Sequence, residues 1–266
     1  MTEAANHSVV TDAVQLVRAD NPNMMTLEGT NTWILRAPGS ETSVVVDPGP
    51  LDEDHLATVL EVAGEVELAL YTHHHFDHTE CIDRFAELTG APARAMGEEF
   101  CRDADPLSDG ELIEAAGLAL EIAAVPGHTT DSIAILVTDD GSLLTGDTIL
   151  GRGTTVIAWP DGVLGPYLDS LARIRELVLE GAVVRFLPGH GPVVEDPLPF
   201  IDYYLEHRAE RLDQVRAAIA AGARTAQEVV EVVYADVEKH LWPAAEMSVR
   251  AQLDYLDGVT PEIGTG

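Results

Sequence analysis

The sequence predicts an α+β protein, in which a larger domain of mixed strands and helices is followed by a small helical domain. Short runs of valine, isoleucine and leucine, which are typical of buried strands, alternate with amphipathic segments up to about residue 197. From residue 198 onward the strand signal is almost absent and long helical patterns replace it. We therefore expect one domain over residues 1–197 and a second over residues 198–266, with the boundary near residues 197–199.

In the first domain, turn residues and helix caps separate the predicted elements. An Ala-Pro-Gly turn at residues 37–39 divides the first two strands, and Asp52 is a candidate N-cap for the first helix. The expected strands span residues 32–35, 43–46, 67–71, 118–125, 132–138, 142–144 and 183–187. The expected helices span residues 51–63, 78–89 and 167–179.

The second domain is predicted to contain three helices and no strands. They span residues 200–221, 225–234 and 244–256. Thr225 and Glu228 have the spacing of a capping box, in which each side chain bonds to the backbone N–H of the other residue.

The chain is strongly acidic. Its 266 residues include 46 acidic and 15 basic side chains, for a formal net charge of −31, and such a surface repels phosphate backbones and anionic lipid. No run approaches the roughly eighteen apolar residues of a membrane span, and the first residues lack a signal-peptide pattern. Cys81 and Cys101 do not form a CxxC pair, which fits a reducing compartment. We therefore expect a cytoplasmic protein with no membrane partner, for which nucleic acid is a disfavoured partner.

The strongest functional signal is the segment HHHFDH at residues 73–78, which has the pattern HxHxDH. It follows a predicted strand and leads into a predicted helix, so a turn there can direct several short side chains toward one point. Imidazole nitrogens and carboxylate oxygens together suit zinc and similar metals.

Three further residues of metal-binding type follow separate predicted strands, and each is preceded by glycine: His128, Asp147 and His190. Glycine lets the backbone turn tightly and direct the next side chain. A single Gly-His or Gly-Asp pair is weak by itself, because turns use these residues for backbone reasons. Together with HxHxDH, in this order and each at a strand end, they predict one composite metal site.

The order HxHxDH, Gly-His, Gly-Asp, Gly-His resembles the metallo-β-lactamase superfamily over roughly residues 24–194. The resemblance implies an αββα sandwich with a dinuclear metal site at one edge. It implies two sets of ligands joined by a bridging Asp147: His73, His75 and His128 for the first metal, and Asp77, His78 and His190 for the second.

The same resemblance assigns roles around the ligands. His74 occupies a variable position of the motif, so we do not expect it to bind metal. Asp47 matches the superfamily's first motif and is expected to orient a ligand histidine from behind.

The expected cofactors are two Zn²⁺ ions, and Fe or Mn would suit the same ligands. The expected chemistry is hydrolysis by a hydroxide that bridges the metals, because bound zinc lowers the pKa of water toward neutrality. The expected catalytic residues are Asp147, as the bridge between the metals, and Asp77, which can also accept a proton from the bridging water. No serine or cysteine nucleophile is required.

The C-terminal segments narrow the family. HRAER at residues 207–211, VVY at 232–234 and HLWPAAE at 240–246 resemble the β-lactamase-like protein 2 family, which adds a small winged-helix-like domain to the sandwich. That family includes single-strand endoribonucleases and thioesterases of acyl-carrier intermediates. Broad-spectrum β-lactamases commonly have cysteine or serine at the position of Asp147, so antibiotic hydrolysis is a disfavoured role.

Three functions remain open. The leading one is hydrolysis of a small or carrier-bound ester, thioester or amide-like carbonyl compound. The alternative is a metal-dependent endoribonuclease that cleaves single-stranded RNA with the same site, because a bridging hydroxide can attack carbon or phosphorus. The third is a non-catalytic binding protein that has lost its metals, which the complete ligand set disfavours. Residues 201–266 contain twelve acidic and six basic side chains without a basic stripe, so we expect this tail to close one wall of the cleft rather than to bind nucleic acid.

Four residues are candidate contacts to a substrate or an anion: Asn31, His207, Arg208 and Arg211. On a helix His207 and Arg211, and also Arg208 and Arg211, can share a face, which permits an anion clamp. The favoured interpretation is that the arginines pair with acids, because acids outnumber bases here; the candidate partners are Asp202, Glu206, Glu210 and the acidic sandwich. For Asn31, both a cleft position and the capping of a turn are open.

Overall fold

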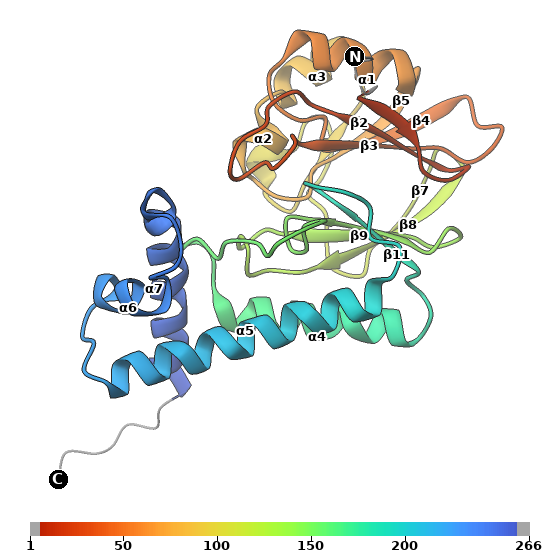
Figure 1. Cartoon of the computed structure of the whole chain (residues 1–266). Helices are drawn as coiled ribbons and strands as arrows, with labels where there is room; N and C mark the ends of the chain where they lie inside the picture. Colours follow the sequence, from red (N-terminus) through yellow and green to blue (C-terminus); the bar gives the residue numbers. More distant parts are fainter. Residues whose placement is uncertain (1–5, 260–266) are drawn as a thin grey trace, which may run out of the picture.

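The computed structural model describes residues 6–259 and shows two β-sheets packed face to face, with helices on their outer faces and further helices beside them (Figure 1). The α+β class and the sandwich are therefore confirmed. In the described part of the chain, no helix combines the length and the apolar character that a bilayer crossing requires.

The first sheet has six strands in chain order. They are β1 (His7–Val9), β2 (Val14–Arg18), β3 (Asn31–Leu35), β4 (Thr42–Val46), β5 (Glu65–Leu70) and β6 (Ala93–Arg94). β4, β5 and β6 are parallel, so the chain crosses over through α1 (Glu53–Ala63) and α3 (Ile82–Thr89). Asp52 caps α1 as predicted, by accepting a hydrogen bond from the backbone N–H of His55. Leu56 of α1 and Phe85 of α3 pack in one buried cluster with Ile34 of β3.

The second sheet has five strands in the spatial order β11 (Arg185–Pro188), β10 (Ser142–Gly146), β9 (Ile133–Val137), β8 (Leu118–Ala124) and β7 (Leu112–Ala115). Only β10 and β11 are parallel, and α4 (Leu164–Leu179) connects them. Leu171 of α4 and Ile201 of α5 (Pro197–Ala220) share a buried cluster with Leu136 of β9. These two helices therefore cover the outer face of this sheet.

Alternate residues of the central strands face the two sides of each sheet. Val44 and Val46 of β4 belong to the core between the sheets, whereas Val45 belongs to the cluster under the helices. Ile133 of β9 likewise belongs to the inner core and Ala134 to the outer cluster. Because both faces are covered, these strands need apolar residues at every position, which explains the continuous apolar runs in the sequence.

The helix α5 begins beside the sandwich and leads to the two C-terminal helices, α6 (Ala226–Val233) and α7 (Trp242–Val259). The predicted capping box of α6 is present, with hydrogen bonds in both directions between Thr225 and Glu228. Val215, Val229 and Val249 belong to a separate buried cluster of this tail. α5 contributes to both clusters, so the boundary near residues 197–199 stays a prediction.

Most predicted strands and helices are present, but the helix predicted over residues 78–89 is wrong. It is two helices, α2 (Phe76–Thr79) and α3, which are separated at Glu80 and Cys81. The separation lets α2 carry Asp77 and His78 toward the strand ends while α3 packs against the sheet.

Several short elements were not predicted. They are β1, β2, β6 and β7, together with the 3-10 helices η1 (Glu98–Phe100) and η2 (Lys239–Leu241). β1, β6 and β7 lie at sheet edges, where a strand has an open side and needs fewer apolar residues. β7, for example, leaves Leu112 exposed. β2 mixes two polar residues into a run of five, so its apolar pattern is weak.

Gly127, which precedes His128, is expected to be sensitive to substitution. Its φ is +135°, and a Cβ there would lie 2.3 Å from the Cα of Tyr167 on α4. Gly39 provides a control, because its φ is +88° but a Cβ would meet nothing within 4 Å. We expect Gly127→Ala to lower the free energy of unfolding by about 1–3 kcal/mol more than Gly39→Ala, since overpacking adds to backbone strain. Chemical denaturation measures both, and equal losses would contradict the packing of α4 on this loop.

Candidate metal centre

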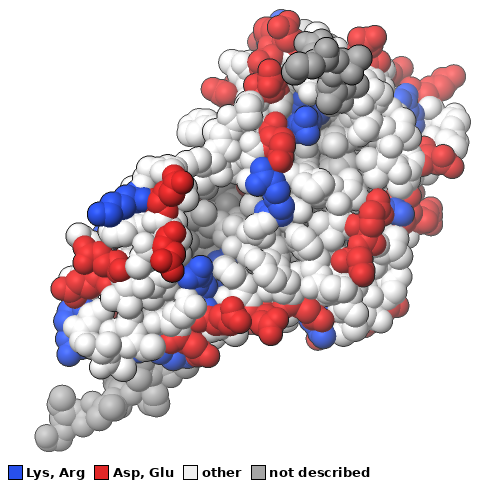
Figure 2. Space-filling view, in the orientation of Figure 1, with Lys and Arg blue, Asp and Glu red and all other residues white. Residues whose placement is uncertain are grey.

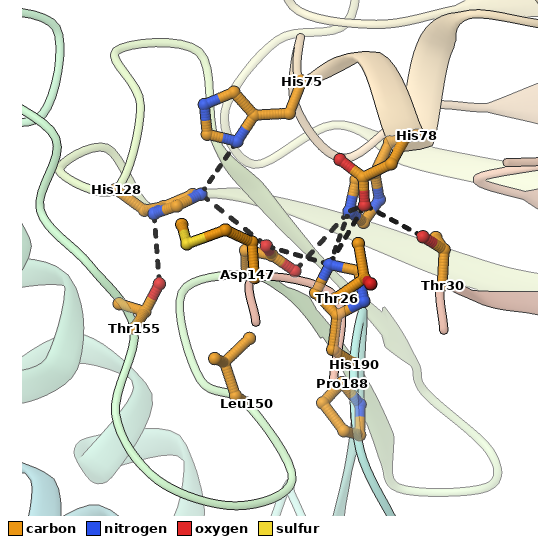
Figure 3. A network of polar contacts seen from close by, with 12 residues as sticks. Thr26, Thr30, His75, His78, His128, Asp147, Leu150, Thr155, Pro188 and His190 are labelled. Carbon is orange, nitrogen blue, oxygen red and sulfur yellow. Dashed lines mark hydrogen bonds and ion pairs between the residues drawn. The ribbon is translucent and has the colours of Figure 1, made fainter. Parts of the chain in front are cut away.

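The predicted ligands lie at the ends of strands from both sheets, and they meet at one edge of the sandwich (Figure 3). The ligands from the first sheet follow β5, in the turn that leads into α2 and in α2 itself. The ligands from the second sheet follow β8, β10 and β11, and they are His128, Asp147 and His190. The sandwich therefore brings together residues that are far apart in the sequence.

One group consists of His73, His75, His128 and Asp147, whose potential ligand atoms all lie within 4.8 Å of one another. The Nδ1 atom of His75 lies 3.0 Å from Nε2 of His73 and 3.1 Å from Nε2 of His128. Oδ2 of Asp147 lies 4.0 Å from Nε2 of His73 and 3.8 Å from Nε2 of His128. The three imidazoles and one carboxylate thus point toward a common centre.

A second group consists of Asp77, His78 and His190. Oδ2 of Asp77 lies 3.4 Å from Nε2 of His78 and 3.1 Å from Nε2 of His190, and the two Nε2 atoms are 3.4 Å apart. These are the residues that the resemblance assigned to the second metal, and they lie beside the first group.

Asp147 lies between the two groups. Its Oδ1 atom is 3.6 Å from Nε2 of His78, and its Oδ2 atom is 3.3 Å from Nε2 of His190. Oδ1 is buried and has no hydrogen-bond partner among the residues that the structure describes. A buried carboxylate oxygen without a donor is costly, and a cation beside it would remove that cost. The donor set of imidazoles and carboxylates therefore fits divalent metal ions, and Asp147 can contact one on each side.

Asp47 holds two of the histidines from behind. Its Oδ2 accepts a hydrogen bond from Nδ1 of His78 at 2.8 Å. It also accepts one from Oγ1 of Thr72 at 2.7 Å, and Oγ1 of Thr72 is 3.0 Å from Nδ1 of His73. A histidine that donates from Nδ1 presents the lone pair of Nε2 toward the centre, so these contacts set both the ring orientation and the tautomer.

Backbone carbonyls and threonines support the other ligands. Nδ1 of His128 lies 3.1 Å from Oγ1 of Thr155 (Figure 3). The same nitrogen lies 2.9 Å from the carbonyl oxygen of Val156. Nδ1 of His190 lies 3.2 Å from the carbonyl oxygen of Gly29. Oγ1 of Thr30 donates to Oδ2 of Asp77 at 2.9 Å.

Sequence reasoning gave no role to the supporting threonines Thr30, Thr72 and Thr155. The role of Thr72 could have been suspected from the sequence, because this residue directly precedes the HxHxDH segment. The other two reach the site only through the folded loops. His74, as expected for a variable position, lies outside both groups and contacts Asp131 at 2.8 Å.

The electrostatic environment differs between the two groups. In the first, burial and the neighbouring imidazoles lower the pKa of His73 well below its usual value, and burial lowers the pKa of His75 to about 4. In the second, burial opposes charge, but the carboxylates of Asp77, Asp47 and Asp147 outweigh it and raise the pKa of His78 to about 9. The second group therefore holds protons at neutral pH that a metal ion would displace.

Asn31 lies behind the site rather than beside a cleft. It is fully buried, and its Nδ2 donates to the carbonyl oxygens of Pro188 and Gly191 at 2.9 Å each. These two residues flank His190 in sequence, so Asn31 fixes the loop that carries this histidine.

The expectation that Arg208 and Arg211 pair with acids is wrong. Neither arginine forms an ion pair with a carboxylate of the described chain. Asp202, one of the expected partners, pairs with Arg175 instead. Arg208 turns inward and donates to the carbonyl oxygen of Thr155 at 2.5 Å. Arg211 turns toward α6 and lies over the ring of Tyr234 at 4.7 Å. Arg208 thus points toward the sandwich, and Arg211 points toward the other C-terminal helices.

Comparisons with known proteins agree with this geometry. Residues 25–190 match the metallo-beta-lactamase superfamily, and residues 225–257 match the beta-lactamase associated winged helix domain. The predicted winged-helix-like tail is thereby confirmed.

Individual relatives cover most of the chain. A beta-lactamase-like protein 2 homolog from Drosophila melanogaster is 32% identical over 272 residues, which cover 93% of this chain and 89% of the relative. An atrochrysone carboxyl ACP thioesterase from Aspergillus fumigatus is 30% identical over 250 residues, which cover 85% of this chain and 75% of that relative. The crystal structure of a metallo-beta-lactamase family protein from Thermus thermophilus aligns with a TM-score of 0.77 at 23% identity, over 93% of this chain and 94% of that one, and supports the fold.

A methyl group at Gly189 is expected to disrupt the centre. A Cβ there would lie 2.4 Å from Oδ1 of Asp147 and 2.8 Å from Cε1 of His78. We expect Gly189→Ala to displace the carboxylate and to lower the metal content per chain, measured by elemental analysis after purification. Gly165→Ala is the matched control, because its nearest neighbour would be at 3.6 Å. Full metal content in Gly189→Ala would contradict the position given to Asp147.

The second group is expected to bind metal more weakly as the pH falls. Histidine must lose its proton to bind a metal, and the pKa of His78 is about 9. Each displaced proton lowers the apparent affinity by up to about tenfold per pH unit below that value. His75, with a pKa of about 4, imposes no such loss between pH 6 and 8. Chelator competition at pH 6, 7 and 8 should therefore resolve one pH-sensitive site and one nearly constant site. Two sites with the same pH dependence would contradict this difference.

Proposed function

This chain belongs to the metallo-β-lactamase superfamily and is a hydrolase, and from that premise we propose that it uses two metal ions to cleave an ester, thioester or amide-like carbonyl bond. The observation that carries the proposal is the position of Asp147 between the two groups, where its Oδ2 lies 3.8 Å from Nε2 of His128 and 3.3 Å from Nε2 of His190. A centre for a single ion would not require this second set of donors.

We propose Zn²⁺ in both positions, while the same nitrogen and oxygen donors also accept iron or manganese. His73, His75 and His128 would hold one ion, Asp77, His78 and His190 the other, and Asp147 would contact both. When bound, such a pair of ions supplies a water of lowered pKa and a positive charge that polarises the bond under attack.

The protein's own groups orient this chemistry and handle the proton. Asp47 and Thr72 keep two imidazoles directed at the centre through their hydrogen bonds. Asp77 has the more exposed carboxylate, with 27% of its side chain accessible against 10% for Asp147. It is therefore the better placed of the two to take up a proton from water, and the Oγ1–H donated by Thr30 holds it in position.

The substrate we propose is a small or carrier-bound thioester or ester. The relative named as an ACP thioesterase supports this class. The net charge of −31 disfavours single-stranded RNA, the alternative substrate, because the acidic exterior repels a phosphate backbone.

Removal of the shared carboxylate tests the proposal directly. We expect Asp147→Asn and Asp147→Ala to reduce turnover of a generic thioester at least about hundredfold, because both ions lose a ligand. The fold should survive, since the side chain is surrounded by ligands rather than by the apolar core. Thermal unfolding checks this point in parallel.

Asp131→Asn provides the control. Asp131 contacts His74, which lies outside both groups, so this variant removes a nearby charge without removing a ligand. Full thioester turnover by Asp147→Ala would contradict the two-metal proposal. Cleavage of single-stranded RNA by the wild-type protein, with no turnover of thioesters or esters, would instead establish the alternative substrate.

A further inference from the structure

A cavity of about 340 Å³ lies between the C-terminal helices and the sandwich, next to the metal centre. Figure 2 shows the molecule hollowed between these two parts, with both basic and acidic side chains around the hollow. The cavity walls come from three places, which are the segment of residues 154–156, the helix α5 and the region from Tyr234 to α7. We call it the tail pocket. Its polar lining includes Thr154, Thr155, His207, Arg208, Arg211 and Ser248.

Arg208 gives the tail pocket a buried positive charge without a counterion. The residue is only 4% exposed, and its guanidinium lies over the ring of Tyr167 at 5.0 Å. One of its nitrogens donates to the carbonyl oxygen of Thr155, but Nε is buried and has no hydrogen-bond partner in the described chain. Burying a charge is costly unless an opposite charge is near. No carboxylate of the described chain pairs with this guanidinium, so an anion from outside the protein would stabilise it.

Arg211 and His207 add to the same positive environment. Arg211 is half-buried, and its guanidinium donates to neutral oxygens of Gln214 and Val233. Burial and the charges of Arg208 and Arg211 lower the pKa of His207 to about 4. The field that disfavours a proton on His207 favours an anion at the same place. Nδ1 of His207 is also buried and has no partner within residues 6–259.

Arg208 and Arg211 form no ion pair with a carboxylate of the described chain, a state that they share with Arg18, Arg36 and Arg224. With 46 acidic side chains against 15 basic ones, most arginines of the described chain form ion pairs with carboxylates. Such an excess of acids offers many potential partners to any exposed guanidinium. Two arginines without one, both facing the same cavity, therefore indicate a binding site for an external anion.

One wall of the tail pocket also contacts a histidine of the metal centre. Thr155 and Val156 line the pocket, and both contact Nδ1 of His128, the first through Oγ1 and the second through its carbonyl oxygen. The tail pocket and the first metal group therefore lie on opposite sides of residues 155 and 156, and a substrate whose anionic group lies in the pocket would have to extend around this segment to reach the metals.

We propose that the tail pocket binds an oxyanion, such as a phosphate monoester or a carboxylate, on the thiol or alcohol part of the substrate. This inference rests on the proposed hydrolysis of a carbonyl compound and adds a requirement for an anion away from the bond that is cleaved. Arg211 is the residue to substitute in a test of this pocket. Arg208 also donates a hydrogen bond to the backbone carbonyl of Thr155, so its loss would disturb the local structure as well. A substrate that carries such a group is positioned by the tail, which gives the winged-helix domain a role in specificity.

Binding of a simple phosphate monoester tests the pocket without turnover. Butyl phosphate is titrated calorimetrically into the metal-loaded full chain, with butanol as the uncharged comparison. We expect Arg211→Gln to weaken binding about tenfold or more, because a charge-assisted contact is lost, and Arg211→Lys to restore part of it. Arg216→Gln, on the same helix, is the matched control, since its exposed side chain pairs with Asp213 outside the pocket. Thermal unfolding verifies that each variant is folded.

Kinetics then test the link to the reaction. Two acyl thioesters are compared, one with a terminal phosphate on the thiol part and one without it. The wild-type protein should prefer the phosphorylated thioester in kcat/KM, and Arg211→Gln should reduce that preference about tenfold while Arg216→Gln retains it. Butyl phosphate that binds equally to Arg211→Gln and wild type would overturn the proposal, because the phosphate would then lie at the metals alone.

Two further outcomes separate the pocket from the proposed reaction. Arg211-dependent binding of butyl phosphate without any thioester or ester turnover would support the pocket and reject the proposed reaction. Arg211-dependent binding of a short single-stranded RNA, with no such dependence for butyl phosphate, would overturn the pocket's proposed ligand class.

Discussion

The carboxylate of Asp147 is the interaction on which the arrangement of both ligand groups depends. It lies 3.8 Å from the ligand atom of His128 in one group and 3.3 Å from that of His190 in the other. In the second group, protonated histidines compensate the charges of the neighbouring carboxylates, because the pKa of His78 is raised to about 9. In the first group burial keeps the imidazoles uncharged, so a cation there would supply the missing positive charge. If this carboxylate moved, the two groups would no longer share a ligand and the centre would become two incomplete sites.

The packing of the sandwich holds the strand ends in the positions that bring Asp147 to both ligand groups. The residues between the sheets and under the helices are apolar, so the strands are rigid and their ends are fixed in space. The polar ligands are confined to the loops and the short helix α2 at one edge, where Gly127 and Gly189 let the backbone pass close to Tyr167 and Asp147. The C-terminal helices lie against this edge, so the same fold places the arginines of the tail near the ligand His128.

The sequence was sufficient for the elements with strong local signals. Buried strands on both faces, the N-cap at Asp52 and the capping box at Thr225 depend on neighbouring residues and were predicted correctly. The break between α2 and α3, the edge strands and the contact of Thr30 with Asp77 depend on distant parts of the fold, so no local pattern could reveal them. The unpaired state of Arg208 and Arg211 was also not predictable, because composition reports how many acids surround a base but not which way its side chain turns.

The central claim is that two metal ions share Asp147, and a crystal structure of the metal-loaded protein with anomalous scattering data tests it most directly. The expected result is two anomalous peaks, one among His73, His75 and His128 and the other among Asp77, His78 and His190. Asp147 should contact both peaks through its carboxylate. A single peak in crystals grown with excess metal, or two peaks with Asp147 bound to only one of them, would contradict the account.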